Sequence, residues 1–138
     1  MKENVAASAA LAHPVTLPGT TVMHARVDRL DDLVTLSLTG EFDLAGVDAF
    51  TALMVDLEAT HPRAIAVDVK ELSFIDSNGL RSLLNAHDRA TGSHAFAVLN
   101  GSGPAHRMLM MTGLDKRLMM IDHAQELRDR MAEESAGG

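Results

Sequence analysis

Apolar and polar residues alternate in two neighbouring stretches near the start of the chain, residues 22–30 and 33–39. Alternation with a period of two is typical of strands that turn one face toward the core. Asp31 and Asp32 lie between the two stretches, and aspartate is common in tight turns. The pattern therefore predicts an antiparallel hairpin.

After the hairpin, helical patterns alternate with nearly continuous apolar runs, which are typical of strands buried on both faces of a parallel sheet. Strands are expected at 64–69, 94–99 and 118–121. Helices are expected to begin after Asp43, near Ser77, at Pro104 and after a capping pair of Asp122 and Gln125, the last helix running to Met131. This order predicts an α/β fold, with a mostly parallel sheet, an antiparallel edge strand and about four helices packed on the sheet.

Methionines gather in the last third of the chain, at positions 108, 110, 111, 119 and 120. Met108, Met111 and Leu114 are expected to pack inward, and core filling is the predicted role of most of the cluster. Because methionine adapts to surfaces of different shape, the cluster is also a candidate for partner choice.

The composition is that of one globular domain, with 138 residues of which 46% are apolar and 22% charged. Residues 1–20 are rich in alanine and contain two prolines, so we expect a flexible N-terminal tail. The domain is predicted to span residues 21–132, and residues 133–138 are expected to fray. No stretch reaches the roughly eighteen apolar residues that a membrane span requires.

The chain carries 19 acidic and 12 basic residues, a formal net charge of −7, without a local run of Lys or Arg. Nucleic acids and anionic membranes attract clustered basic residues, so neither is an expected partner. A protein with a basic patch fits this charge better. The chain has no cysteine, which excludes disulfides and thiolate chemistry and is compatible with the cytoplasmic location that we expect.

No set of catalytic or metal-binding residues is complete in the sequence. Phosphate-binding glycine motifs are absent, and the seven histidines lack the His-Glu-x-x-His spacing of a zinc site. Ser77 lies in Ile-Asp-Ser-Asn-Gly, which lacks the first glycine of a serine hydrolase's nucleophile turn. Asp68, a candidate phosphate acceptor, lies inside an apolar run and is interpreted as structural. We therefore expect no enzyme activity, no metal and no cofactor.

The candidate functional site is the predicted strand-to-helix turn around Ser77, where an apolar run ends at Asp76. Either Asp76 or Ser77 can cap the helix, whose start also favours a phosphate group through its unpaired N–H groups and partial positive charge. Physical grounds alone favour a capping role for Ser77. Against this, Gly79 weakens the first helical turn, and Asn78 and Gly79 keep the turn small enough for another protein to approach.

Three ordered segments carry a family resemblance: Gly40-Glu41-Phe42-Asp43, the stretch Val67 to Leu80 with its Asp76-Ser77-Asn78-Gly79-Leu80, and Met111-Thr112-Gly113-Leu114. With these segments the chain resembles the bacterial STAS domains of anti-sigma-factor antagonists, from about Thr21 to Met131. The resemblance implies a small sheet with helices on it, and a domain that binds an anti-sigma factor of the serine-kinase type, thereby releasing a sigma factor.

The resemblance also implies a switch. In the family, phosphorylation of the serine in Asp-Ser-x-Gly-Leu abolishes binding and a serine phosphatase restores it, and this serine corresponds to Ser77. Many relatives have a second small hydroxyl residue where this chain has Asn78, a departure that puts the specificity for the partner in doubt. For Asp43, a helix cap and a direct partner contact both remain open. The partner-binding residues implied are Asp43, Asp76, Ser77, Asn78, Gly79, Leu80 and Arg81.

Two other functions remain open. The chain is compatible with a STAS subunit of another assembly, such as a lipid-transport complex or a signalling scaffold, whose surface docks without phosphorylation. Capture of a transporter ATPase would indicate that function. A small enzyme or nucleotide-binding domain of similar topology is disfavoured by the missing phosphate loops, and tight nucleotide binding would indicate it. The oligomeric state is open as well.

Overall fold

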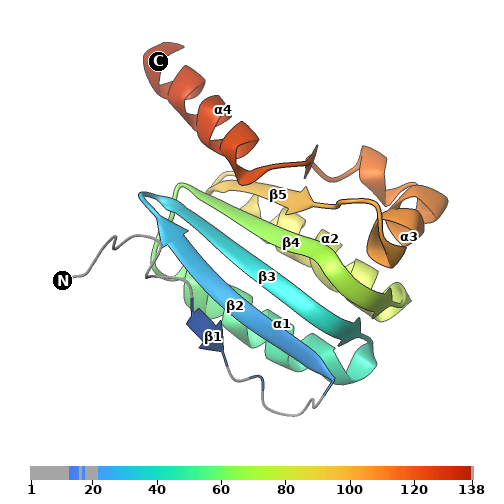
Figure 1. Ribbon diagram of the computed structural model, residues 1–138. Helices are drawn as coiled ribbons and strands as arrows, with labels where there is room; N and C mark the ends of the chain where they lie inside the picture. Colours follow the sequence, from blue (N-terminus) through green and yellow to red (C-terminus); the bar gives the residue numbers. More distant parts are fainter. Residues whose placement is uncertain (1–12, 16, 18–21, 138) are drawn as a thin grey trace.

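The computed structural model describes residues 13–15, 17 and 22–137, whose strands form one six-stranded sheet in the order β1-β2-β3-β4-β5-β6 (Figure 1). Strands β1 to β3 are antiparallel neighbours, and β3 to β6 are parallel neighbours. This confirms the predicted α/β fold with a mostly parallel sheet and an antiparallel edge. The strands are β1 (His13–Val15), β2 (Met23–Leu30), β3 (Leu33–Phe42), β4 (Ala64–Ile75), β5 (Ala95–Leu99) and β6 (Met120–Ile121).

The helices lie on both faces of the sheet, and Figure 1 shows α1 and α2 together behind it. Their bounds are α1 (Leu44–Glu58), α2 (Ser77–Ala90), α3 (Pro104–Thr112) and α4 (Ala124–Gly137), with a short 3₁₀ helix, η2 (Leu114–Lys116), after α3. Alternate residues of β4 point to opposite faces, so the strand contributes to two cores. Ile65 and Val67 belong to the large core under α1 and α2, whereas Ala64 and Ala66 join a smaller core with Leu127 and Met131 of α4.

A short strand lies within the segment that the sequence predicts to be a tail. Residues His13–Val15 pair with residues 25–27 of β2, and Leu17 is buried in the large core. A three-residue strand is too short to show a periodic pattern, which is why the sequence does not reveal it. Residues 1–12, 16, 18–21 and 138 lie outside the described residues, so the boundaries of the tail and of the domain stay predictions.

The end of β3 depends on Gly40, whose φ is +90°. A Cβ at this position would lie 1.9 Å from the main-chain oxygen of Val22, a distance that no side chain tolerates. The next residue, Glu41, donates its N–H to the same oxygen at 2.9 Å. Only glycine therefore permits the turn of the chain that leads through Phe42 to Asp43.

The expectation that Met111 packs inward is wrong. Met111 is 79% exposed and Met110 is 53% exposed. Helix α3 buries Ala105 and Leu109, which lie four residues apart on one helix face, and this places Met111 on another side. Met108 and Leu114 do pack against the large core as partly buried residues, in agreement with the prediction.

The start of α4 is held by Glu126 and not by Gln125. The carboxylate of Glu126 accepts main-chain hydrogen bonds from Asp122 at 2.7 Å and from His123 at 2.9 Å, whereas Gln125 donates to Asp129. The helix continues to Gly137, beyond its predicted end at Met131. None of the helices in the described ranges is long and apolar enough to cross a membrane.

Candidate functional site

Two helices begin next to each other at the carboxyl ends of β3 and β4, and each is capped by an aspartate. Asp43 accepts a hydrogen bond from the N–H of Ala45 at 3.0 Å. Asp76 accepts from the N–H groups of Asn78 at 2.9 Å and Gly79 at 3.1 Å through one oxygen, Oδ1. Asp76, rather than Ser77, is therefore the cap of α2, which decides between the two residues that the sequence left open.

Asn78 contacts this cap through its side chain. Its side-chain nitrogen donates to the second carboxylate oxygen of Asp76 at 3.4 Å, and its main-chain oxygen accepts a hydrogen bond from the hydroxyl of Ser82 at 3.0 Å. A serine or threonine hydroxyl is shorter than an asparagine amide. The structure thus gives Asn78 a role in the orientation of Asp76.

Ser77 is the first residue of α2, and its side chain is exposed. Its hydroxyl makes no hydrogen bond to any residue that the structure describes. The N–H groups of Asn78 and Gly79 already bind Asp76, so the start of the helix does not offer these donors to a phosphate. In this respect the structure differs from the expectation that the helix start itself would receive a phosphate group. The hydroxyl of Ser77 is free to react or to contact a partner.

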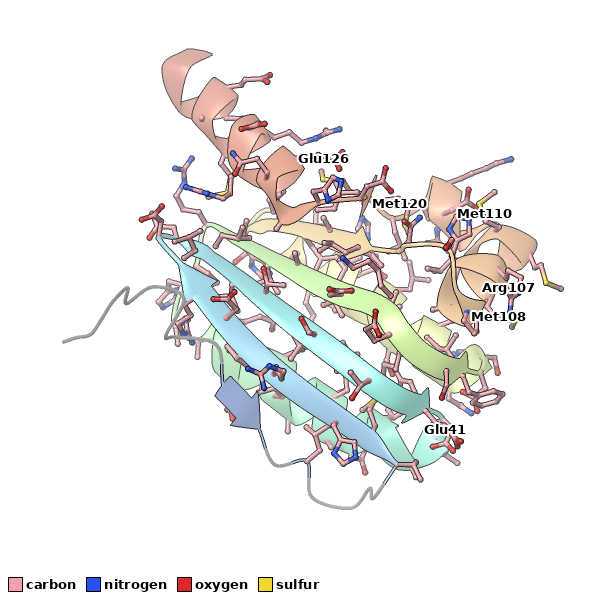
Figure 2. The ribbon with its side chains drawn as sticks, in the orientation of Figure 1. Glu41, Arg107, Met108, Met110, Met120 and Glu126 are labelled. Atoms are coloured by element: carbon pink, nitrogen blue, oxygen red, sulfur yellow. The ribbon has the colours of Figure 1, made fainter. Side chains whose placement is uncertain are left out.

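Two open grooves meet at Ser77. One, of about 410 Å³, lies between the end of β4 and α3, and its lining includes Phe74, Arg107, Met108 and Met111. Figure 2 shows Arg107 and Met108 on the part of α3 nearest the carboxyl end of β4, and Met110 on the part of α3 farther from it. The other groove, of about 450 Å³, follows α2, and its lining includes Leu80, Arg81, Leu84 and Leu114.

The surface around Ser77 is rich in exposed apolar side chains. Phe74 is 47% exposed, Met111 is 79% exposed, and Leu44, the residue after the Asp43 cap, is 69% exposed. We call the surface formed by Phe74, Ser77, Arg81, Arg107 and Met111 the Ser77 face. Exposed apolar groups beside charged ones are typical of protein-binding surfaces.

Comparison with known proteins places the chain in a family. The family model described as "Mlab, STAS domain" matches residues 25–122, which is more than half of the chain. The chain belongs to the STAS-domain family. This STAS domain is 29% identical over 89 residues to the anti-sigma-F factor antagonist RsfB of Mycobacterium tuberculosis, a match that covers 64% of this chain and 73% of RsfB.

Solved structures show the same fold at lower identity. An anti-sigma factor antagonist from Mycobacterium paratuberculosis superposes with a TM-score of 0.70 at 22% identity, covering 81% of this chain and 94% of the other. The phosphorylated form of the Bacillus cell fate determinant SpoIIAA gives a TM-score of 0.56 at 22% identity, covering 78% and 98%. The expected resemblance to STAS domains is therefore confirmed.

The STAS domain brings the expected site residues to one end of the sheet but exposes them unequally. Ser77 and Arg81 are exposed, and Asp43, Asp76 and Asn78 are partly exposed. Gly79 and Leu80 lie beneath this surface, Leu80 with only 3% of its surface exposed. A partner contact by any of these seven residues stays a prediction.

Phe74 and Arg107 belong to the Ser77 face, and the sequence did not single them out as site residues. Met111 also belongs to this face, and the sequence named it only within the methionine cluster that is a candidate for partner choice. The buried residues Leu72 and Ile75 are three apart at the end of β4, so this part of the strand departs from simple alternation and exposes Phe74. The i, i+4 pair of small and large apolar residues in α3, Ala105 and Leu109, is a sequence signal that could have placed Met111 outside the core. Arg107 carried no such signal. Among the described residues, no group of three or more His, Asp and Glu could hold a metal ion.

Proposed function

We propose that this STAS domain is an anti-sigma factor antagonist that binds an anti-sigma factor of the serine-kinase type and so releases a sigma factor in the cytoplasm. It acts by binding and not as an enzyme. Phosphorylation of Ser77 switches the binding off, and a serine phosphatase restores it. The name of RsfB and the resemblance of the three sequence motifs support this partner class.

The observation that carries the proposal is the exposed hydroxyl of Ser77, which makes no hydrogen bond within the described residues. In the transfer, Ser77 Oγ forms a bond to the terminal phosphorus of a nucleoside triphosphate held by the kinase. The bond from that phosphorus to the bridging oxygen breaks, the nucleoside diphosphate leaves, and the hydroxyl proton passes to a base of the kinase. Because Asp76 alone caps α2, this step removes no hydrogen bond from the fold.

The phosphate would act on the partner surface and leave the fold intact. It adds a charge of about −1.5 to −2 next to the carboxylate of Asp76. A partner that covers Ser77 must remove water from this charge and fit the added volume between the two grooves. Binding is therefore lost through repulsion, desolvation and steric blockage.

The test compares binding of the same anti-sigma kinase to the Ser77→Ala and Ser77→Asp variants by calorimetry. Ser77→Ala should bind like the parent, and Ser77→Asp should bind more weakly. Ser93→Asp is a matched control, because it adds the same charge at an exposed serine beyond the other end of α2. Equal binding by both Ser77 variants would contradict the proposal.

The site of modification is tested separately. The full chain is incubated with candidate anti-sigma kinases and ATP, and the modified residue is located by mass spectrometry. Modification of a residue other than Ser77 would overturn the assignment, whatever the binding measurements show.

A second candidate function is a STAS subunit of another assembly, such as a lipid-transport complex, in which the Ser77 face docks without phosphorylation. The observation that supports this second function is the matching family model, whose description names the STAS domain of Mlab. A pull-down with the full chain separates the two functions: a histidine-kinase-like ATPase supports the first, and a transporter ATPase supports the second.

A further inference from the structure

Two exposed arginines flank Ser77. Arg107 lines the groove on the α3 side of Ser77, and Arg81 lines the groove along α2. Both side chains are exposed, and neither guanidinium makes a hydrogen bond or an ion pair with any residue that the structure describes. In contrast, Arg89 pairs with Glu58 at 3.1 Å. Within the described residues, no side-chain hydrogen bond or ion pair therefore depends on Arg81 or Arg107.

The helix geometry directs Arg81 toward Ser77. The two residues are four apart, which places them one above the other on the same face of α2. Side chains of a helix lean toward its N-terminus, so the long side chain of Arg81 can reach toward the Ser77 hydroxyl, with which it lines one groove.

Arg107 approaches from another element. Helix α3 packs beside the end of β4, and Figure 2 shows Arg107 on the part of α3 that faces this end of the sheet. Arg107 and Ser77 line one groove, whereas Arg81 and Ser77 line the other. The two arginines therefore lie on different sides of the serine.

A phosphoryl group on Ser77 would have few other donors nearby. The N–H groups of Asn78 and Gly79 bind the side chain of Asp76, and the N–H of Leu80 binds its main-chain oxygen. The nearby carboxylate of Asp76 would also repel the new negative charge. The first helical turn, residues 77–80, contains no lysine or arginine, so a full positive charge for the phosphate is available only from side chains outside this turn.

We infer that Arg81 and Arg107 together bind the phosphoryl group of phosphorylated Ser77. Guanidinium groups form paired, charge-assisted hydrogen bonds with phosphate oxygens, and two of them on different sides leave the phosphate little freedom to rotate. This inference rests on the proposed phosphorylation of Ser77. It adds that the modification draws two surface cations toward Ser77, so the charge pattern of the whole Ser77 face changes.

The test uses the full chain with phosphoserine incorporated at position 77 during synthesis, which requires no kinase. The second ionisation of the phosphate, with a pKa of about 6 in a free phosphoserine, is followed by phosphorus NMR as the pH is varied. Removal of a neighbouring positive charge by Arg81→Gln or Arg107→Gln should raise this pKa by about one unit in each variant. Arg26→Gln, which removes an exposed arginine from β2, is the control and should leave the pKa unchanged.

An unchanged phosphate pKa in both variants overturns the inference, and a rise in only one of them overturns the assignment to two arginines. The result does not depend on the proposed function, because the phosphate is installed without an enzyme. A chain that no anti-sigma kinase modifies would contradict the proposed function, while the NMR titration would still show whether these arginines bind a phosphate at this position.

Discussion

Gly79 lies directly against the main-chain carbonyl of Phe42, and a Cβ at position 79 would be 2.8 Å from the oxygen of that group. The same Cβ would be 2.7 Å from the side chain of Ile75. Since the N–H of Asp76 also donates to the oxygen of Phe42 at 3.2 Å, the first turn of α2 is fixed against the end of β3. Close packing within the domain therefore explains why position 79 is a glycine. The sequence had suggested a different reason, a small turn that another protein can approach.

Gly79→Ala should lower the free energy of unfolding by about 1–2 kcal/mol, because overpacking outweighs the better helix propensity of alanine. Gly46 provides a matched control, since it occupies the third position of α1 as Gly79 does in α2. A Cβ there would meet chiefly the flexible end of Met23, at 2.9 Å, which can move away. Gly46→Ala should therefore change stability by less than about 0.5 kcal/mol. Urea unfolding measures both, and equal losses would contradict the packing argument.

Loss of the α2 cap should destabilise the domain. Asp76→Ala removes the acceptor of two main-chain hydrogen bonds and should cost about 1–2 kcal/mol in urea unfolding. Asp43→Ala, which removes the acceptor of one such bond in α1, should cost less. Asp76→Asn retains a side-chain oxygen acceptor and should recover most of the loss. A fully stable Asp76→Ala variant would show that the cap contributes little.

The exposed apolar residues of the Ser77 face should contribute to binding and not to stability. Met111→Ser and Phe74→Ser should each weaken binding of the anti-sigma kinase at least about tenfold, since buried apolar anchors dominate most interfaces. Their unfolding free energies should change by no more than about 0.5 kcal/mol, as is usual for surface positions. Val55→Ser is the control, because Val55 is 48% exposed on α1 and lies three turns after the start of the helix. Unchanged affinity in both variants would exclude this part of the surface from the interface.

The start of α4 should become less stable in acid. Hydrogen bonds from the main-chain N–H groups of Asp122 and then His123 lower the pKa of Glu126 below its ordinary value. The folded state thus favours the carboxylate, so its stabilising effect is present above the pKa of the unfolded chain and is lost as the pH falls through the lower, folded pKa. NMR titration of the carboxyl group should show the lowered pKa directly.

Hydrogen exchange then reports the effect on the helix. Amide protection in α4 should fall in acid for the parent, and this fall should be smaller in Glu126→Gln. Glu133→Gln, at an exposed position later in the same helix, should behave like the parent. An unshifted pKa for Glu126 would mean that the capping contact does not form in solution.

The elements of this fold were predictable wherever the periodic pattern was long. Asp43, Ser77 and Pro104 were correctly placed at the starts of helices, because capping residues and apolar stripes indicated the same boundaries. The capping pattern in the sequence did not identify Glu126, because Gln125 and Glu126 are neighbours and either side chain could accept hydrogen bonds from the main chain at the start of α4. The structure shows that Glu126 accepts them. The prediction for Met111 was wrong because the spacing of Met108, Met111 and Leu114 fits one side of a helix but does not show which side faces the sheet. In the structure, α3 buries Ala105 and Leu109.

The position of Ser77 was also predictable, since the strand and the helix on either side have clear patterns. Its surroundings were not. Arg107 and Met111 come from α3, a separate element that lines the same groove as Ser77 only because of tertiary packing. The hydroxyl of Ser77 is free because Asp76 caps α2. The residue types alone could not show which of these two residues is the cap.

The hydroxyl of Ser77 takes no part in the network of contacts that keeps α2 folded. A chemical change at this atom therefore breaks no contact of the unmodified domain, and any change in stability comes from the contacts that the new group itself makes. A sample with modified and unmodified molecules would hold two populations of the same fold that differ in mass, surface charge and affinity. Intact-mass spectrometry or native electrophoresis would separate these populations, whereas a view of the backbone alone would not.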